Sequence, residues 1–150
     1  EKKDRHRNIT IFVGSVGGGK PQLSCALSNA LMKEGVGVIY MGYRESIMKI
    51  KQNVMNMDEY EKIMSRYKKC KVLLIDDLFK GNITLSDINI MFEIVNYRYF
   101  NNLPMIMSTE KGGKELIEID EAIGSRILEM AKDYNMELKG GKLNYRIYGK

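Results

Sequence analysis

Apolar residues along this chain alternate between two arrangements. Short continuous runs of β-branched and aliphatic side chains are typical of strands, and longer stretches with apolar residues three and four positions apart are typical of amphipathic helices. The first run, 9–13, stops at a cluster of glycines, and a helical stretch follows it. Such alternation predicts an α/β protein with a mainly parallel sheet covered by helices. Strands are expected at 9–13, 36–41, 72–76, 105–109 and, together with a hairpin, between 134 and 148.

The stretches between these runs carry signals for helix ends. Gly35 stands where a glycine closes a helix C-terminus, and residues 44–70 predict two consecutive helices. Ser86 is the expected N-cap of the next helix, and Asp120 is the expected N-cap of a later one. Short helices are expected near 114–117 and 121–130, and the predicted buried faces hold Ile47, Ile50 and Val54 in one helix and Ile88, Met91, Phe92 and Val95 in another.

The composition is that of one ordinary globular domain. The 150 residues are 44% apolar and 29% charged, which excludes a disordered or fibrous chain. No apolar run approaches the roughly 20 residues of a membrane-spanning helix, and residues 1–7 are almost all charged. We therefore expect a soluble, cytoplasmic protein that makes no membrane contact.

Cysteine and histidine are too scarce for several kinds of chemistry. His6 is the single histidine, and Cys25 and Cys70 stand far apart in segments with helical spacing. A zinc site, a disulfide scaffold and any mechanism that needs two histidines are therefore not expected. Chemistry falls to carboxylates, lysines, arginines and backbone amides.

A glycine-rich segment, GSVGGGK, joins the first predicted strand to the first predicted helix. It fits the first seven positions of the phosphate-binding loop G-x-x-x-x-G-K-[ST], in the strand–helix context that the motif requires. Glycines let successive backbone N–H groups converge on an anion, and Lys20 would reach the β- and γ-phosphates. The alternative is a flexible glycine turn with a surface lysine. Residues expected at the nucleotide are Gly14, Ser15, Val16, Gly17, Gly18, Gly19, Lys20, Pro21 and Gln22.

The eighth position of the motif departs from the pattern. Pro21 stands where Ser or Thr is expected, and proline has neither the hydroxyl that ligates Mg²⁺ nor an N–H to join the phosphate cradle. Proline fits the first turn of a helix, so we expect the fold to be retained. The substitution puts nucleotide affinity and metal positioning in question.

Two carboxylates end the third predicted strand. The run 72–76 is almost entirely apolar, which predicts a strand buried on both sheet faces, and Asp76 and Asp77 follow its apolar residues. In a phosphate-loop ATPase the first carboxylate holds Mg²⁺ and the second orients the attacking water. Two aspartates after a strand also occur as a plain turn or helix cap. The glycine-rich loop earlier in the chain favours the catalytic interpretation.

Polar residues also end the fourth predicted strand and mark a late helix. A side chain in the stretch 108–110 could sense the γ-phosphate or hold the attacking water, or simply be where a buried strand turns polar. Thr109 and Glu110 are the candidates. Arg126 lies on the polar side of a helix whose apolar stripe holds Ile123 and Ile127, where most arginines are solvated or salt-bridged.

Positive charge is concentrated in the predicted helix pair. Residues 44–71 contain eight Lys or Arg and four Asp or Glu, so four of the five net positive charges lie there. Such a surface suits a phosphate backbone, with an aromatic residue available for base stacking. A solvated amphipathic helix is the alternative. The candidate nucleic-acid contacts are Tyr43, Lys49, Gln52 and Asn53.

Taken in order, these motifs resemble the AAA+ ATPase domain of DnaC/DnaI-type replicative helicase loaders, phage versions included, and of the related IstB transposition helpers. The resemblance is carried by GSVGGGK, VLLIDD, MSTE and GSRI in their predicted elements, and it spans about residues 9–148. It implies an α/β P-loop NTPase fold with three layers, a mainly parallel five-stranded sheet, a C-terminal hairpin and no lid domain. It further implies that 1–150 is a single AAA+ domain from the C-terminal part of a longer protein.

The resemblance also implies cofactors and roles for particular residues. ATP or ADP and Mg²⁺ would be the ligands, with Asp76 and Asp77 as the Walker B pair. Thr109 or Glu110 would take the sensor-I position. Arg126 matches an arginine finger, which acts on ATP held by a neighbouring subunit.

Partners follow from the same resemblance. The basic helices would contact single-stranded DNA, subunits would assemble into ATP-bridged oligomers, and a replicative DNA helicase would bind through a region absent from these residues. Two other functions stay open. A small P-loop kinase shares the loop and sheet, although the paired aspartates and the lack of an arginine-rich lid argue against it. A binding module with a degenerate nucleotide site is favoured by Pro21.

Overall fold

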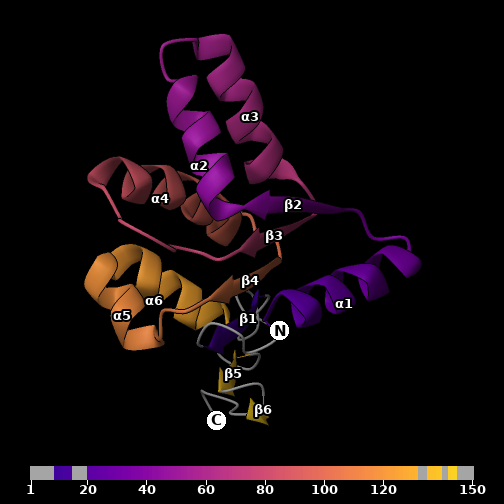
Figure 1. The fold of residues 1–150 in the computed structure, drawn as a ribbon. Coiled ribbons are helices and arrows are strands. Elements are labelled where there is room, and N and C mark those ends of the chain that lie inside the picture. Colours follow the sequence, from indigo (N-terminus) through magenta and orange to yellow (C-terminus); the bar gives the residue numbers. More distant parts are fainter. Residues whose placement is uncertain (1–8, 15–19, 132–134, 140–141, 145–150) are drawn as a thin grey trace.

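The computed structural model describes residues 9–14, 20–131, 135–139 and 142–144. Within them, a single six-stranded sheet runs in the order β2-β3-β4-β1-β5-β6 (Figure 1). Strands β1 to β5 run parallel to one another, and β6 is antiparallel to β5, which confirms the parallel sheet with a C-terminal hairpin. The strands are β1 (Ile9–Gly14), β2 (Val38–Gly42), β3 (Val72–Asp76), β4 (Met105–Thr109), β5 (Asn135–Lys139) and β6 (Lys142–Asn144).

Helices cover both faces of the sheet, as expected for a three-layer protein. One face packs Leu74 and Ile106 against Leu27 and Leu31 of the first helix, and the other face packs against the remaining helices. None of the described helices has the length and apolar character needed to cross a membrane. The helices are α1 (Lys20–Lys33), α2 (Tyr43–Gln52), α3 (Met57–Lys69), α4 (Leu85–Phe100), α5 (Gly113–Ile119) and α6 (Glu121–Met130).

Helix ends agree with the sequence at two positions and differ at a third. Gly35 adopts φ +82° after α1, and the Asp120 side chain caps α6 by accepting from the Ile123 amide. The N-cap of α4, however, is Thr84, and the prediction of Ser86 was wrong. Thr84 accepts from the Asp87 amide while the Asp87 carboxylate accepts from the Thr84 amide, a reciprocal capping box that Ser86 lacks the matching acid to form.

The buried face of α4 is also rotated from the predicted one. Met91 and Val95 are buried as expected, but Phe92 is 37% exposed and Ile88 is only half-buried. The helix begins two residues earlier, in its capping box, and turns Ile90, Met91, Ile94, Val95 and Arg98 inward. Predicted apolar residue Val54 follows the end of α2 and is exposed.

The α2–α3 pair stands out from the edge of the sheet at β2 (Figure 1). Arg98 of α4 anchors its base: the guanidinium is fully buried and donates to the carbonyl oxygens of Cys70 and Pro104, both at 2.7 Å. Ser46 and Tyr67 join the two helices through a hydroxyl–hydroxyl hydrogen bond of 3.1 Å. The pair is therefore a firmly attached projection.

Candidate nucleotide site

The junction of β1 and α1 lies where a phosphate-binding loop belongs. β1 ends at Gly14 and α1 begins at Lys20, with Pro21 in its first turn, so the helix accepts proline as predicted. Residues 15–19 and the side chains of 20–24 lie outside what the structure describes. Phosphate contacts by Ser15, Val16, Gly17, Gly18, Gly19, Lys20 and Gln22 therefore stay predictions.

The Asp76 carboxylate at the end of β3 is held by two hydroxyl groups. Ser108 Oγ donates to Asp76 Oδ1 at 2.6 Å, and Tyr40 Oη donates to Asp76 Oδ2 at 2.9 Å. The two donors come from β4 and β2, the strands that flank β3. Each carboxylate oxygen keeps a lone pair for a further ligand, and both lie on the sheet face that α1 covers.

Ser108 takes the position that the sequence assigned to its neighbours. Its side chain is fully buried and accepts from the Asp77 amide at 3.0 Å besides donating to Asp76. The Thr109 hydroxyl is instead committed elsewhere, since it donates to the Leu78 carbonyl at 2.9 Å. Of the two predicted sensor residues, Thr109 therefore faces away from Asp76 because strand side chains alternate, and Glu110 lies beyond the strand end.

Asp77 begins a tightly held loop. Its φ of +57° is in the left-handed region, and Phe79 has φ +60°, a conformation that costs about 1 kcal/mol for a residue with a Cβ. The loop keeps this conformation because the Leu78 amide donates to the Ser108 carbonyl at 2.8 Å. The Asp77 carboxylate is partly exposed and lies 3.9 Å from Lys80 Nζ. The carboxylates of the adjacent Asp76 and Asp77 thus lie in different surroundings.

Tyr40 was not among the sequence candidates. Its ring is 57% exposed at the edge strand, and only its position two residues before the strand end relates it to Asp76. Partial burial of the hydroxyl, followed by its hydrogen bond to Asp76, raises the pKa of Tyr40 to about 12. At neutral pH the phenol is therefore protonated and donates.

The donor set fits a magnesium–nucleotide complex. The described residues contain no cluster of three or more His, Cys, Asp or Glu side chains that would form an all-protein metal cage. Mg²⁺ is commonly bound by one or two carboxylates, with water and substrate phosphates completing its coordination. Asp76, orientated by Ser108 and Tyr40, is the described residue that would hold the ion.

Comparison with known proteins decides the family. The sequence matches the IstB-like ATP binding proteins over residues 3–131, which is most of its length. The chain belongs to this family. Its fold is that of P-loop AAA+ proteins, and the family is related to the DnaC/DnaI helicase loaders and to DnaA.

Particular relatives of this IstB-like chain come from phage elements and replication proteins. "Phage-like element PBSX protein XkdC" of Bacillus subtilis (strain 168) is 37% identical over 98% of this chain and 57% of its own length. A crystal structure of DnaI covers 89% of this chain and 74% of its own, at 26% identity and TM-score 0.75. Replication initiator DnaA bound to AMPPCP and single-stranded DNA covers 88% and 40%, at 23% identity and TM-score 0.73. The chain spans about half the length of the curated relatives it matches.

The prediction that Tyr43 belongs to a nucleic-acid-binding face of this IstB-like protein is wrong. Tyr43 is only 3% exposed, and its ring packs edge-on against Phe79 with centroids 5.6 Å apart. It is the first residue of α2 and is turned inward, where burial raises the pKa of its hydroxyl. Tyr43 is therefore unavailable for base stacking.

The other predicted nucleic-acid residues divide between surface and structural positions. Lys49 and Gln52 are exposed on α2, together with Arg44. Asn53 is the C-cap of α2, and its side-chain Nδ2 donates to the Lys49 carbonyl at 2.8 Å. The exposed part of the predicted face is thus narrower than the sequence indicated.

Arg126 of this IstB-like chain packs on α4. Its guanidinium carbon lies 5.6, 5.4 and 5.8 Å from the ring centroids of Phe92, Tyr99 and Phe100. One terminal nitrogen donates to the Ala122 carbonyl at 3.3 Å, and Nε is buried without a hydrogen-bond partner. The structure therefore places the predicted finger in an aromatic setting of its own chain, and its action on a neighbour stays a prediction.

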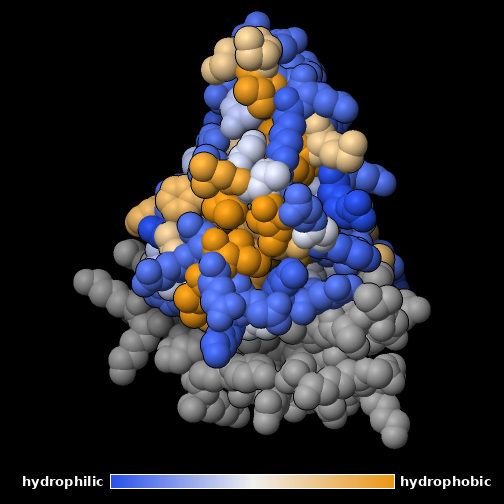
Figure 2. Space-filling model, turned by 60° about the vertical axis from the view of Figure 1, so that its left-hand side comes forward, coloured by the Kyte–Doolittle hydropathy of each residue, from blue (hydrophilic) through white to orange (hydrophobic). Residues whose placement is uncertain are grey.

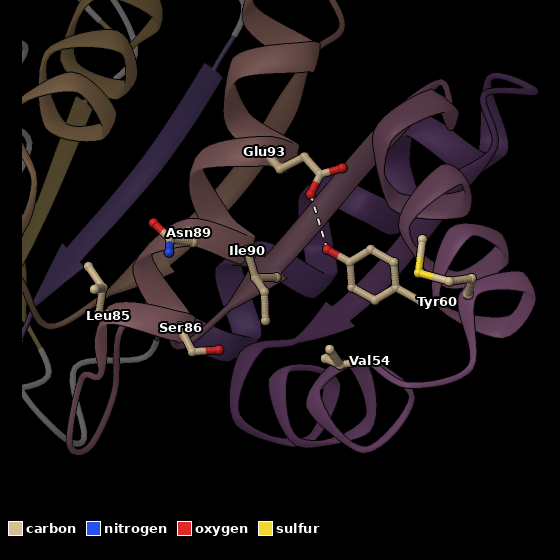
Figure 3. A pocket seen from close by; sticks show the side chains of 8 residues that line it. Val54, Tyr60, Leu85, Ser86, Asn89, Ile90 and Glu93 are labelled. Atoms are coloured by element: carbon tan, nitrogen blue, oxygen red, sulfur yellow. Dashed lines mark hydrogen bonds between the residues drawn. The ribbon is translucent and has the colours of Figure 1, made fainter.

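A groove of about 560 Å³ lies between α3 and α4, apart from the nucleotide site (Figure 3). Tyr60 Oη donates across it to Glu93 Oε2 at 3.1 Å, and Lys68 pairs with the same carboxylate. Figure 2 shows apolar side chains gathered among hydrophilic ones on the side of the molecule where α4, α5 and α6 lie. The groove is lined by Val54, Met57, Tyr60, Leu85, Ser86, Asn89, Ile90 and Glu93.

Proposed function

We propose that this chain is the ATP-binding domain of a replicative helicase loader that assembles on single-stranded DNA under the control of ATP. The observation that carries the proposal is the Asp76 carboxylate, held at the end of β3 by Ser108 and Tyr40 on the face where α1 begins. The similarity of the chain to DnaI, and to a DnaA bound to AMPPCP and single-stranded DNA, supports the proposed binding of a nucleotide and of DNA.

Each residue of the site has a part in nucleotide binding. The backbone of 14–19 would bind the phosphates, and Lys20 would offset their charge. Asp76 would hold Mg²⁺, which when bound neutralises charge on the β- and γ-phosphates. Asp77 would orient the attacking water, while Ser108 keeps the two aspartates in register through its two hydrogen bonds.

Arg126 would act between subunits. In an ATP-bridged oligomer its guanidinium would stabilise charge on the γ-phosphate of the neighbouring subunit. The aromatic contacts with α4 would then have to be exchanged for the phosphate, so assembly and release of Arg126 would be linked.

Single-stranded DNA would follow the exposed basic side chains of α2. Arg44 and Lys49 lie there, beside the uncharged Gln52, on the projecting helix pair. Binding of single-stranded DNA is tested by fluorescence anisotropy of a labelled oligothymidine in the presence of Mg·ATP. We expect binding that weakens with salt, and Arg44→Ala and Lys49→Ala should each reduce the magnitude of the logarithmic salt slope by about 0.7.

A matched variant separates contact from net charge. Lys114→Ala removes an exposed lysine of α5, far along the chain from α2, and should leave affinity nearly unchanged. Failure of the chain to bind the oligonucleotide, or equal weakening by Lys114→Ala, would contradict the DNA surface.

Pro21 favours a second candidate. A module that no longer hydrolyses ATP would not need the P-loop hydroxyl, and this chain lacks it. Such a scaffold, or a transposition helper of the IstB type, would keep the fold and the family match. Release of phosphate from ATP by the assembled protein distinguishes a hydrolysing loader from a degenerate module.

A further inference from the structure

A hydroxyl group is missing from one place in the nucleotide site and present in another. Pro21 cannot supply the hydroxyl that a P-loop Ser or Thr gives to the metal. Tyr40, from the edge strand β2, brings a hydroxyl to within 2.9 Å of the carboxylate that would hold that metal. Pro21 belongs to α1, and α1 covers the sheet face on which Tyr40 contacts Asp76.

Strand register explains how Tyr40 reaches Asp76. Tyr40 pairs with Leu74 and Gly42 pairs with Asp76, so the ring must run along its own strand past Gly42 to reach the carboxylate. A Cβ at Gly42 would lie 3.3 Å from Tyr40 Cε1 and 3.4 Å from Tyr40 Oη. The absent side chain at Gly42 therefore leaves the room in which the phenol lies.

Tyr40 lies on the sheet face that α1 covers, because its register partner Leu74 packs against Leu27 and Leu31 of that helix. The Tyr40 hydroxyl and the Asp76 carboxylate therefore face the same side of the sheet as the helix that begins with the P-loop lysine.

We propose that Tyr40 is a positioning residue of the nucleotide site that replaces, through Asp76, the contribution lost with the P-loop hydroxyl. This inference rests on the proposed function. The Tyr40 hydrogen bond keeps Asp76 Oδ2 orientated, and Ser108 does the same for Oδ1, so the carboxylate is held in one orientation toward the metal. A metal that has lost one protein ligand depends more on the orientation of the other.

A double-mutant cycle tests the inference. Calorimetric titration of Mg·ATP is compared among the native chain, Tyr40→Phe, Pro21→Thr and the double variant. Phenylalanine keeps the ring over Gly42 and removes only the hydroxyl. We expect Tyr40→Phe to raise the Kd for Mg·ATP roughly five- to tenfold in the native background. This effect is at the lower end of the range for a hydrogen bond to a charged group, because Tyr40 is exposed. In the Pro21→Thr background we expect a change below about twofold, since the hydroxyl is restored.

Titration of ATP with EDTA provides a readout specific to the metal. Without Mg²⁺ the native chain and Tyr40→Phe should bind ATP equally, whereas a general loss of structure would weaken both titrations. Equal Mg·ATP affinity of the native chain and Tyr40→Phe would overturn the inference and leave the proposed function standing. The same holds for equal loss in both backgrounds. Binding by Pro21→Thr alone would show that Tyr40 replaces nothing, and no binding by any of the four proteins would overturn the proposed function itself.

Discussion

Ser108 Oγ lies 2.6 Å from Asp76 Oδ1 and also accepts from the Asp77 amide at 3.0 Å. One hydroxyl of β4 therefore fixes both acidic residues at the end of β3. Because β4 lies between β3 and β1, this hydroxyl also connects the carboxylates to the strand that leads into the P-loop.

Ser108→Ala removes both hydrogen bonds. The Asp77 amide and one Asp76 oxygen lose their partner, so we expect the free energy of unfolding to fall by about 1–3 kcal/mol and Mg·ATP affinity to weaken. Urea unfolding and calorimetry measure the two effects. Ser125→Ala, at an exposed position of α6, is the matched control and should change neither. A Ser108→Ala protein as stable as the native one would contradict the assigned role.

Gly124 allows α6 to lie directly on the backbone of α5. A Cβ there would lie 2.6 Å from the Ile117 amide nitrogen and 2.8 Å from the Leu116 carbonyl carbon. Backbone cannot move aside as a side chain can, so Gly124→Ala should destabilise the chain by about 2 kcal/mol or more. Gly37→Ala, where a Cβ would meet nothing within 4 Å, should be nearly neutral in the same urea titration. Equal midpoints for the two variants would refute the close packing.

Arg126 contributes to the stability of the isolated chain. Three aromatic rings of α4 surround its guanidinium, and such contacts with a partly desolvated cation contribute about 1–2 kcal/mol together. Arg126→Ala should lower the urea midpoint accordingly, whereas Arg66→Ala, exposed on α3, should not. Unchanged stability of Arg126→Ala would mean that the arginine is free in solution.

Asp87 and Lys51 join α4 to α2 through an ion pair. Burial alone would raise the pKa of Asp87, but hydrogen bonds from Lys51 and Thr84 outweigh it and lower the pKa. A depressed carboxyl pKa contributes stability that is present above the ordinary value near 4 and is lost as pH falls through the folded value. Lys51→Met should therefore destabilise the chain by about 1–2 kcal/mol at pH 7, and the difference should shrink below pH 4. A pH-independent difference in urea unfolding would contradict this.

Sequence was sufficient for most features whose signal is local, although the Thr84–Asp87 capping box, which is also local, was missed. Alternating apolar patterns gave the sheet and its helices, and the order of motifs placed Asp76 at the end of β3. Gly35 and Asp120 cap helices through contacts within a few residues, which the sequence displays directly.

Contacts between strands and helices distant in sequence could not be predicted in this way. Ser108 and Tyr40 reach Asp76 because of the register of β4 and β2 on β3, which no single segment reveals. Tyr43 is buried and packs edge-on against Phe79, which belongs to the loop after β3. Each of these contacts depends on how segments distant in the sequence are aligned with one another in the fold.

Calorimetric titration of Mg·ATP into the native chain, beside Lys20→Ala and Asp76→Asn, tests the central claim that this site binds nucleotide despite Pro21. The account predicts one saturable site in the native chain, loss of binding in Lys20→Ala, and loss of the Mg²⁺ dependence in Asp76→Asn. Absence of binding by the native chain, or undiminished binding by Lys20→Ala, would contradict it.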